Sequence, residues 1–441
     1  MKAKKKKPGG KSQQRCAMET LLIHGKAFTT KWDYSHHVVP PISASATFRL
    51  DNVKRGAQGF VEFAHSDEAS TKAPIYIYDR LGEPNKGLLE ESLAFAERGE
   101  TAVTFATGMA AISAALGILT KSGDEIVAHD ALYGCTFSLM RNWYPRYNIA
   151  VRFIPMTNLR LLRKTITPRT RVLYFESPVN PNLDLIDIAA VAEIVKKENA
   201  RRRSHQRIFI VIDNTFATPF CQRPLEIGAD FVVHSLTKNI GGFGTDMGGA
   251  VIGPEWSRDR LLLYRKDFGG VLAAKSAWPI LVYGLPTLAM RVKHQEHSAH
   301  EIAAFLSLDE RIDTVRYPGL ESHPHYDLAR HQMIDYEGNF APGSLIYFIV
   351  KGRTPNERRT RGERLINWIA KNAYTITLAV SLGNIRTLIE HPSSMTHSAI
   401  PTGEQERAGI DPGGIRLSIG MECVDDIISD LKKGLMAIEK S

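Results

Sequence analysis

Short apolar runs that end in polar residues alternate with amphipathic segments through the middle of the chain. The apolar runs predict β-strands, and they are "TAVTFAT" (101–107), "DEIVAHD" (124–130), "IAVRFIP" (149–155), "RVLYFESP" (171–178), "RIFIVIDNT" (207–215) and "DFVVHS" (230–235). The segments between several of them predict helices, such as 87–99, 108–123 and 187–200. Strands that alternate with helices indicate an α/β fold, in which a mainly parallel sheet is covered by helices on both faces.

The two ends of the chain have other patterns. Residues 18–82 include the proline-interrupted "VVPPISASATF" (38–48) and predict an extended arm. From about Met290 a long polar helix, the strand-like "GSLIYFIVKG" (343–352) and a final helix (424–441) predict a smaller α+β domain. The predicted boundaries are a disordered basic tail (1–17), the N-terminal arm (18–82), a large domain (83–288) and a C-terminal domain (289–441).

The charge of the chain is concentrated in its first residues. The 441 residues carry a formal net charge of +9, and residues 1–15 hold six lysines, one arginine and no acid. Such a segment cannot bury enough apolar surface to fold. The other basic run, "ARRRSHQR" (200–207), lies between a predicted helix and a predicted strand. We interpret both as solvated charge and expect no nucleic-acid partner, although a nucleic-acid-binding protein is the alternative.

Membrane, metal and disulfide signals are weak in this sequence. No apolar run approaches the roughly 20 residues that a membrane span needs, and the basic start has no apolar secretory segment behind it. The cysteines at 16, 135, 221 and 423 lie far apart, without a CxxC pair. We therefore expect no membrane, no metal site, no disulfide framework and a reducing, cytoplasmic location.

One lysine follows the last predicted strand. Lys238 stands in "HSLTKNIGGFGTDMGG", between two hydroxyl residues and a glycine-rich loop. In an open parallel sheet, ligands bind beyond the carboxyl ends of the strands. Partial burial there lowers the pKa of a lysine and makes its amine a nucleophile that forms Schiff bases with aldehydes. A solvated surface lysine is the alternative.

Other strand ends carry groups that suit an aromatic aldehyde cofactor. Asp213 ends the run "IFIVI", and a carboxylate there could keep a pyridine nitrogen protonated. Its alternative role is that of a helix cap or a solvated acid. Tyr133 could stack on the ring, although single tyrosines usually serve packing.

A phosphate site is indicated beside them. Gly108 and Met109 open a predicted helix, whose first N–H groups and dipole favour a phosphate dianion. Ser235 and Thr237 could add hydroxyl donors, with local turn bonding as the alternative. Together with Lys238, these groups describe a site for pyridoxal 5'-phosphate.

The chain resembles the Cys/Met-metabolism family of pyridoxal-phosphate enzymes, which have the type I transferase fold. The matching motifs run from about Ile23 to the C-terminus. They are "PPISASATF", "YDR", "ATGMAAI", "DALYGCT", "FESPVNP", "VIDNTFATPFCQRPLEIGADFVVHSLTK", "SLGNIRTLIEHPSSMTHS" and "GIRLSIGMEC". Their length and order make the resemblance specific.

The resemblance implies a role for each matching residue. Lys238 would hold the cofactor covalently, Asp213 would pair with its ring nitrogen and Tyr133 would stack on the ring. The phosphate would be bound by Gly108, Met109, Ser235 and Thr237.

The resemblance also implies an oligomer. Tyr78 and Arg80 of a neighbouring subunit would complete the phosphate site, so we expect a homodimer with shared sites, arranged as a tetramer. Arg416, helped by Ser381, would bind the carboxylate of the substrate through a bidentate pair.

The chain departs from the family in two places. In "YDRLGEPN", Glu83 stands where the family often has Asn, and "NIGGFGTDMGG" replaces a Ser/Gly-rich segment after the lysine. Both departures lie near the expected mouth of the site and bear on substrate specificity.

The reaction implied is γ-elimination from a sulfur amino acid. Cys135 in "YGCT" and the pair Lys266–Asp267 in "YRKDFGG" resemble methionine γ-lyases, which release methanethiol, 2-oxobutanoate and ammonia. In that role Cys135 would border the reacting sulfur beside Tyr133. A small buried cysteine and a solvated charge pair are the alternatives. Cystathionine γ-lyase, cystathionine γ-synthase and O-acylhomoserine sulfhydrylase share the remaining motifs and stay open as alternatives.

Overall fold

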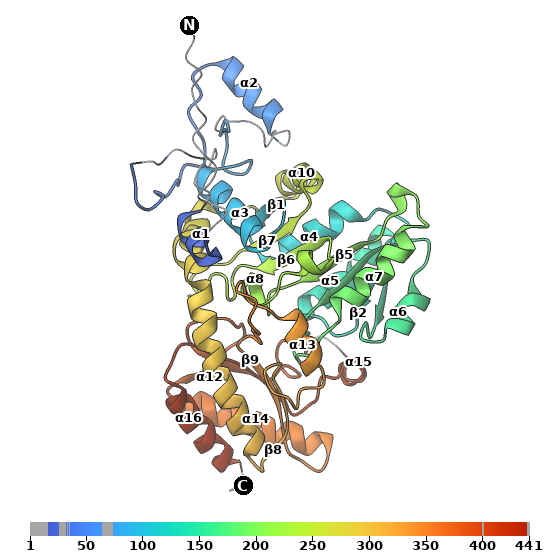
Figure 1. The fold of residues 1–441 in the computed structure, drawn as a ribbon, viewed down its shortest axis with the longest axis vertical. Helices are drawn as coiled ribbons and strands as arrows, with labels where there is room; N and C mark the ends of the chain where they lie inside the picture. The colour runs from blue at the N-terminus through green and yellow to red at the C-terminus, as the bar shows by residue number, and fades with distance from the viewer. Residues whose placement is uncertain are drawn as a thin grey trace.

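The computed structural model describes residues 16–25, 32, 34, 36–63, 74–398 and 401–438. Figure 1 shows an arm at the top, a large domain below it and a smaller domain at the bottom. Residues 1–15 lie outside the described part, so the disorder expected for the basic tail stays a prediction.

The large domain is built on a seven-stranded sheet in the order β1-β7-β6-β5-β4-β2-β3. Strands β3, β2, β4, β5 and β6 are parallel, and β7 is antiparallel to both β1 and β6. The strands are β1 Thr101–Phe105, β2 Glu125–His129, β3 Ala150–Ile154, β4 Thr170–Glu176, β5 Phe209–Asp213, β6 Phe231–Ser235 and β7 Gly249–Gly253. The six predicted strands are confirmed; β7 was not predicted, because its short glycine-bounded run reads as part of the preceding loop.

Helices cover both faces of this sheet. Ile126 and Ala128 pack into the core that contains α4 and α5, whereas Val127 between them packs into the core that contains α6 and α7. The helices are α3 Pro84–Ala96, α4 Gly108–Leu119, α5 Gly134–Asn142, α6 Leu159–Thr165, α7 Ile188–Asn199, α8 Thr218–Cys221, α9 Pro224–Ile227, α10 Arg258–Phe268 and α11 Ala274–Pro279. Shorter helical turns are η2 Tyr144–Tyr147, η3 Ser204–Gln206, η4 Glu255–Ser257, η5 Ile280–Gly284 and η6 Leu285–Thr287.

Helix α12, Leu288–Leu308, leads from the large domain to a five-stranded sheet, as Figure 1 shows. The order of that sheet is β10-β11-β12-β9-β8, with only β10 and β11 parallel among its paired strands. The strands are β8 Ile312–Arg316, β9 Leu345–Val350, β10 Ile376–Leu378, β11 Thr387–Glu390 and β12 Gly414–Ser418, and the helices are α13 Tyr326–Gln332, α14 Pro355–Asn372, α15 Thr402–Arg407 and α16 Val424–Ala437. The α/β fold class is confirmed, and the domain boundaries stay a prediction.

The arm is less extended than the sequence pattern indicates. It contains α1, Met18–His24, and α2, Val53–Glu62. Leu21 and Leu22 of α1 are buried in the large-domain core. The side chain of Asn52 accepts a hydrogen bond from the N–H of Arg55 and so caps α2. Local capping and burial therefore produce two helices in a segment whose prolines favour extended backbone.

The basic run 200–207 is a loop, as predicted. Arg201 and Arg203 are exposed, whereas Arg202 donates to the carbonyls of Thr167 and Thr170 and fixes the loop on the body. None of the helices within the described residues has the length and apolar character needed to cross a membrane.

Candidate active site

The loop that carries Lys238 is compact because its glycines allow close backbone contacts. Lys238 lies just beyond the carboxyl end of β6, and its N–H donates to the carbonyl of Ser235. A Cβ atom at Gly241 would lie 2.6 Å from the carbonyl oxygen of Leu236, and Gly242 has φ +76°. A side chain at either position would displace the turn. The glycine-rich sequence after the lysine therefore fits the turn geometry.

The amine of Lys238 points to the C-terminal domain. Its Nζ donates a 2.7 Å hydrogen bond to the hydroxyl of Ser381. Burial, together with the positive charge of Arg416, lowers the pKa of Lys238 to about 8. A substantial fraction of this amine is therefore neutral at a mildly alkaline pH.

Arg416 on β12 joins the same cluster. Its guanidinium donates to the side-chain oxygen of Asn180 at 3.0 Å and to the carbonyl of Ser381 at 2.9 Å. It also forms a 3.0 Å ion pair with Glu390, and both side chains are buried. Ser381 has φ +103°, a strained conformation for a residue with a Cβ atom. The strained residue thus contacts Lys238 through its hydroxyl and Arg416 through its carbonyl.

Two carboxyl groups lie side by side at the ends of β4 and β5. Glu176 and Asp213 are register partners in the sheet. Asp213 accepts hydrogen bonds from the N–H of Thr215 and the hydroxyl of Tyr174. Burial raises the pKa of Asp213. The pKa of Glu176 is raised by burial and also by the negative charge of the neighbouring Asp213. A buried acid of this kind would be stabilised as a carboxylate by an added cation, which a protonated pyridine nitrogen provides.

Tyr133 and Cys135 are placed at the start of α5. The N–H of Tyr133 donates to Glu176 at 2.7 Å, and the tyrosine ring is 36% exposed. The thiol of Cys135 is exposed. Burial is the main cause that raises the pKa of Tyr133, and the neighbouring thiol of Cys135 is the second. The phenol therefore keeps its proton through the neutral range.

Two of the phosphate residues expected from the sequence, Gly108 and Ser235, lie in contact. A Cβ atom at Gly108 would be 2.9 Å from the Cβ atom of Ser235, so the start of α4 touches the end of β6. Thr107 caps the helix by accepting from Ala110, and the first amides of a helix have no acceptor within it. This arrangement, together with Asp213 and Lys238, fits pyridoxal 5'-phosphate.

Two hydroxyl groups near this point already have backbone partners. Thr215 accepts a hydrogen bond from the N–H of Ser235 at 2.9 Å, and Thr237 accepts one from the N–H of Gly248 at 3.2 Å. Thr237 thus ties the lysine loop to the strand β7 that follows it.

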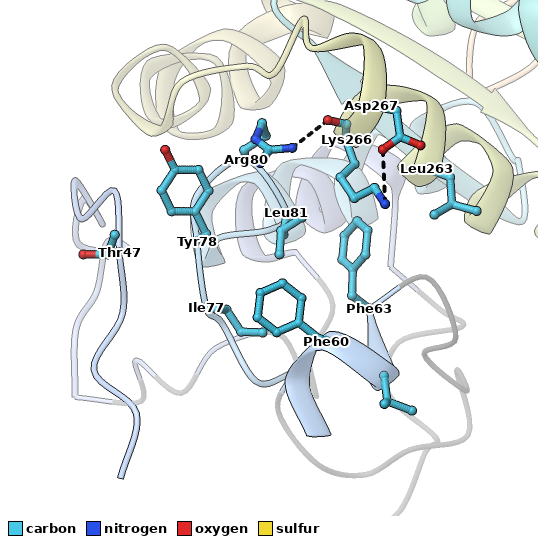
Figure 2. Close-up of a pocket in the computed structure, with 11 residues that line it drawn as sticks. Thr47, Phe60, Phe63, Ile77, Tyr78, Arg80, Leu81, Leu263, Lys266 and Asp267 are labelled. Carbon is cyan, nitrogen blue, oxygen red and sulfur yellow. Dashed lines mark hydrogen bonds and ion pairs between the residues drawn. The ribbon is translucent and has the colours of Figure 1, made fainter. Parts of the chain in front are cut away.

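Tyr78, Arg80, Lys266 and Asp267 lie on a different surface of the same chain. They line a pocket of about 860 Å³ between the arm and α10, and its other walls are apolar except for Thr47. Figure 2 shows Arg80 directed at the backbone of Lys266, whose carbonyl accepts its hydrogen bond at 2.7 Å. Lys266 and Asp267 form an ion pair of 3.1 Å. Cys135 is not among the residues that line this pocket.

Sequence reasoning missed part of the buried network. Glu176, Asn180 and Glu390 hold Tyr133 and Arg416 in place but were assigned no role. The motif "FESPVNP" contains the first two and marks a strand end, which is the signal that could have identified them. No group of three or more His, Cys, Asp or Glu within the described ranges could hold a metal ion.

The fold and the site at the carboxyl ends of its strands define a pyridoxal-phosphate enzyme. Residues 19–436 match the family model described as Cys/Met metabolism PLP-dependent enzyme, and the chain belongs to this family. The predicted family, enzyme class and cofactor are thereby confirmed. The family profile extends over the arm, the large domain and the C-terminal domain.

Named relatives are similar over nearly their whole length. An L-methionine gamma-lyase of Fusobacterium nucleatum subsp. polymorphum is 39% identical over 400 residues, 90% of this chain and 93% of the relative. An L-methionine gamma-lyase of Pseudomonas putida is 37% identical over 92% of this chain and 94% of its own. The crystal structure of cystathionine gamma-lyase from Lactobacillus plantarum, complexed with L-serine, has a TM-score of 0.81 and 30% identity, covering 96% of this chain and 100% of that one.

Proposed function

We propose that this enzyme cleaves the carbon–sulfur bond of L-methionine by γ-elimination and releases methanethiol, 2-oxobutanoate and ammonia. The observation that carries this choice is the exposed thiol of Cys135, which stands two residues after Tyr133 at the start of α5 and contributes to the raised pKa of that tyrosine. Relatives named L-methionine gamma-lyase, at 37–39% identity, support the same choice.

The cofactor would be held by residues on four strand ends. Lys238 would bind its aldehyde, Asp213 would pair with its ring nitrogen, and Tyr133 would cover the ring. Its phosphate would lie at the start of α4, within reach of Ser235. When bound, the cofactor withdraws the electrons that are left at the α-carbon of the substrate after loss of a proton.

Two side chains of this chain would move protons. The Nζ atom of Lys238, with a pKa of about 8, can accept the proton of the α-carbon in its neutral form. The hydroxyl of Ser381 accepts a hydrogen bond from Nζ and so orients the amine. A second proton would leave the β-carbon to Lys238 once its amine has passed on the first, and the electrons of that C–H bond would form the Cβ–Cγ double bond. The phenol of Tyr133 keeps its proton at neutral pH and can donate it to the sulfur as the bond to Cγ breaks.

The substrate carboxylate would bind to Arg416. The buried ion pair with Glu390 and the hydrogen bonds to Asn180 and Ser381 fix the plane of the guanidinium. A guanidinium fixed in this way can form a bidentate pair with a carboxylate. Because Ser381 contacts both Arg416 and Lys238, the carboxylate and the α-carbon of one amino acid would be positioned together.

A neighbouring subunit would complete the site. Tyr78, Arg80, Lys266 and Asp267 share one pocket of the arm, so one contact between subunits would deliver all four to the site of the partner. Tyr78 and Arg80 would bind the cofactor phosphate there, and Lys266 and Asp267 would approach the partner's Cys135. We propose a homodimer of this kind, arranged as a tetramer, in a reducing cytoplasm that keeps Cys135 a thiol.

A substrate panel tests the choice of methionine. The native protein should release methanethiol and 2-oxobutanoate from L-methionine without added thiol. Cys135→Gly should lower the turnover of methionine much more than that of cystathionine or an O-acylhomoserine. Cys423→Ser, which changes an exposed thiol at the start of α16, is the matched control and should leave every rate unchanged.

The alternative activities give different results in the same panel. Cystathionine γ-lyase would cleave cystathionine and leave methionine unchanged. Cystathionine γ-synthase or O-acylhomoserine sulfhydrylase would consume an O-acylhomoserine only with added thiol. Cleavage of cystathionine is tested because two similar proteins are named for it. They are the solved cystathionine gamma-lyase and a Lactococcus lactis relative named cystathionine beta-lyase, which is 32% identical over 95% of this chain.

Hybrid oligomers test the shared site. Chains with Arg80→Ala and chains with Lys238→Ala should each be inactive alone. Mixed dimers should regain part of the activity, because one of their two sites contains both native residues. If hybrids form and remain inactive, Arg80 does not act across the subunit contact.

A further inference from the structure

An ion pair between the buried Lys86 and the partly exposed Asp79 lies beneath the turn that carries Tyr78 and Arg80. The Nζ atom of Lys86 donates to the carboxylate of Asp79 at 2.6 Å and to the carbonyl of the same residue at 2.5 Å. The side chain of Lys86 is 1% exposed. Asp79 stands between Tyr78 and Arg80 in the sequence, so this one cation fixes both the backbone and the side chain at the centre of the turn.

A second buried cation holds the other end of the turn. Arg265 on α10 is 2% exposed and donates to the carbonyl of Leu81 at 3.3 Å. An ion pair with Glu90 of α3 fixes this guanidinium at 2.7 Å. The next residue of α10, Lys266, offers its carbonyl to Arg80. Helix α10 therefore contacts the turn from inside and from outside.

The first turn of α3 supplies the anchor for these contacts. Glu83 caps the helix by accepting from the N–H groups of Asn85 and Lys86. Asn85 donates to the carbonyl of Pro41 and accepts from the N–H of Ser43, which ties the arm to the same helix. The stretch "YDRLGEPN", where the chain departs from the family pattern, is thus one connected unit.

The two outward residues of this turn make few of these contacts. Tyr78 is 42% exposed, and Arg80 is exposed and lies over the ring of Tyr78 at 5.6 Å. Exposed side chains keep a fixed direction only when their backbone is fixed. The inward contacts of Asp79 and Leu81 provide that constraint, because each is made by a buried cation that cannot easily find another partner.

We propose that the Asp79–Lys86 ion pair is a positioning device that aims Tyr78 and Arg80 at the cofactor phosphate of the neighbouring subunit. This inference rests on the shared site proposed above. Asp79 and Lys86 do not touch the cofactor; they set the backbone of the turn. A small displacement of a bound group is sufficient to lose most of its contribution, since about 1 Å can cost on the order of 100-fold in rate.

Cofactor affinity measured with and without the phosphate group tests the proposal. The full-length proteins Lys86→Met and Asp79→Asn are titrated with pyridoxal 5'-phosphate and with pyridoxal, and binding is followed by tyrosine and tryptophan fluorescence. The Kd of pyridoxal 5'-phosphate should rise about 10-fold, equivalent to one lost phosphate contact, while the Kd of pyridoxal stays unchanged. Their double variant should show the same increase as either single change, because both act through one contact.

Two controls make the result specific. Arg171→Met breaks a comparably buried ion pair with Asp124 at the amino ends of the parallel strands, and it should change neither Kd. Arg80→Ala should raise the Kd of pyridoxal 5'-phosphate alone. Thermal unfolding is measured for each variant; if Lys86→Met does not fold, Asp79→Asn decides.

Each other outcome has a definite meaning. If Lys86→Met and Asp79→Asn weaken both ligands equally, or neither, while Arg80→Ala affects only the phosphorylated ligand, the positioning role is wrong and the shared site stands. If Arg80→Ala also leaves the preference for the phosphorylated ligand intact, the phosphate role of Arg80 is wrong, and the positioning role fails with it.

Discussion

The amine of Lys238 and the hydroxyl of Ser381 are joined by a 2.7 Å hydrogen bond across 143 positions of sequence. The contact links the large domain to the C-terminal domain at the point where the chemistry is proposed. It also places Lys238 near Arg416. Burial is the main cause of the lowered pKa of Lys238, and the positive charge of Arg416 is the second.

Cofactor capture by the cofactor-free protein should depend on the protonation of Lys238. Only the neutral amine attacks an aldehyde, so the rate of capture should rise with pH and reach half of its maximum near pH 8. Ser381→Ala removes an acceptor for the ammonium and should move this midpoint down. Arg416→Gln removes a neighbouring positive charge and should move it up. Stopped-flow absorbance between pH 6 and 10 measures all three midpoints; shifts of the same sign would contradict the electrostatic account.

Gly108→Ala should weaken cofactor binding. The added methyl group would lie 2.9 Å from the Cβ atom of Ser235 and would separate the start of α4 from the end of β6. The Kd of pyridoxal 5'-phosphate should rise about 10-fold or more, equivalent to at least 1.4 kcal/mol. Gly403→Ala, where no atom lies within 4 Å of the added methyl, is the matched control and should leave the Kd unchanged.

Arg291→Met should destabilise the loop after Lys238. The buried guanidinium of Arg291 donates to the carbonyls of Asn239, Ile240 and Gly284. Without it these acceptors lose their partner, and the expected cost is about 3 kcal/mol in the free energy of unfolding. Urea unfolding followed by circular dichroism measures the loss. Arg260→Met changes an exposed arginine on α10 and should alter the unfolding midpoint little.

Glu296 should make the protein less stable as the pH rises. Burial raises the pKa of Glu296 from 4.5 to about 7, so the folded protein holds a proton that the unfolded chain releases. Stability from this group is therefore present below pH 4.5 and is lost between pH 4.5 and 7. Glu296→Gln keeps an acceptor for the N–H of Gly343 and should be more stable than the native protein at pH 8, by about 3 kcal/mol. The difference should disappear near pH 4.5, as thermal unfolding at both values would show; a pH-independent difference would exclude titration of Glu296 as its cause.

Strand ends were the part of the site that the sequence could predict. Lys238, Asp213 and Gly108 each follow an apolar run, and a parallel sheet brings such ends to one edge whatever the loops between them. The contacts of Arg416 with Asn180 and Glu390 depend instead on how two domains pack. No periodicity within either segment contains that information.

The arm shows a second limit of sequence reasoning. Pro40 and Pro41 favour extended backbone, but they do not predict α2, which begins after the cap at Asn52. The placement of Lys266 beside Arg80, away from Cys135, depends on the packing of α10 against the arm. Resemblance associates Lys266 and Cys135 with one function, whereas the pocket that Lys266 lines does not include Cys135.

Helix α12 has a mechanical consequence for this enzyme. Its 21 residues form a rod of roughly 30 Å that leads into the domain bearing Arg416 and Ser381. A tilt of about 2° at one end moves the other by about 1 Å over this length. A substitution that tilts α12, even far from the reacting atoms, would therefore change the distance between the amine of Lys238 and the guanidinium of Arg416.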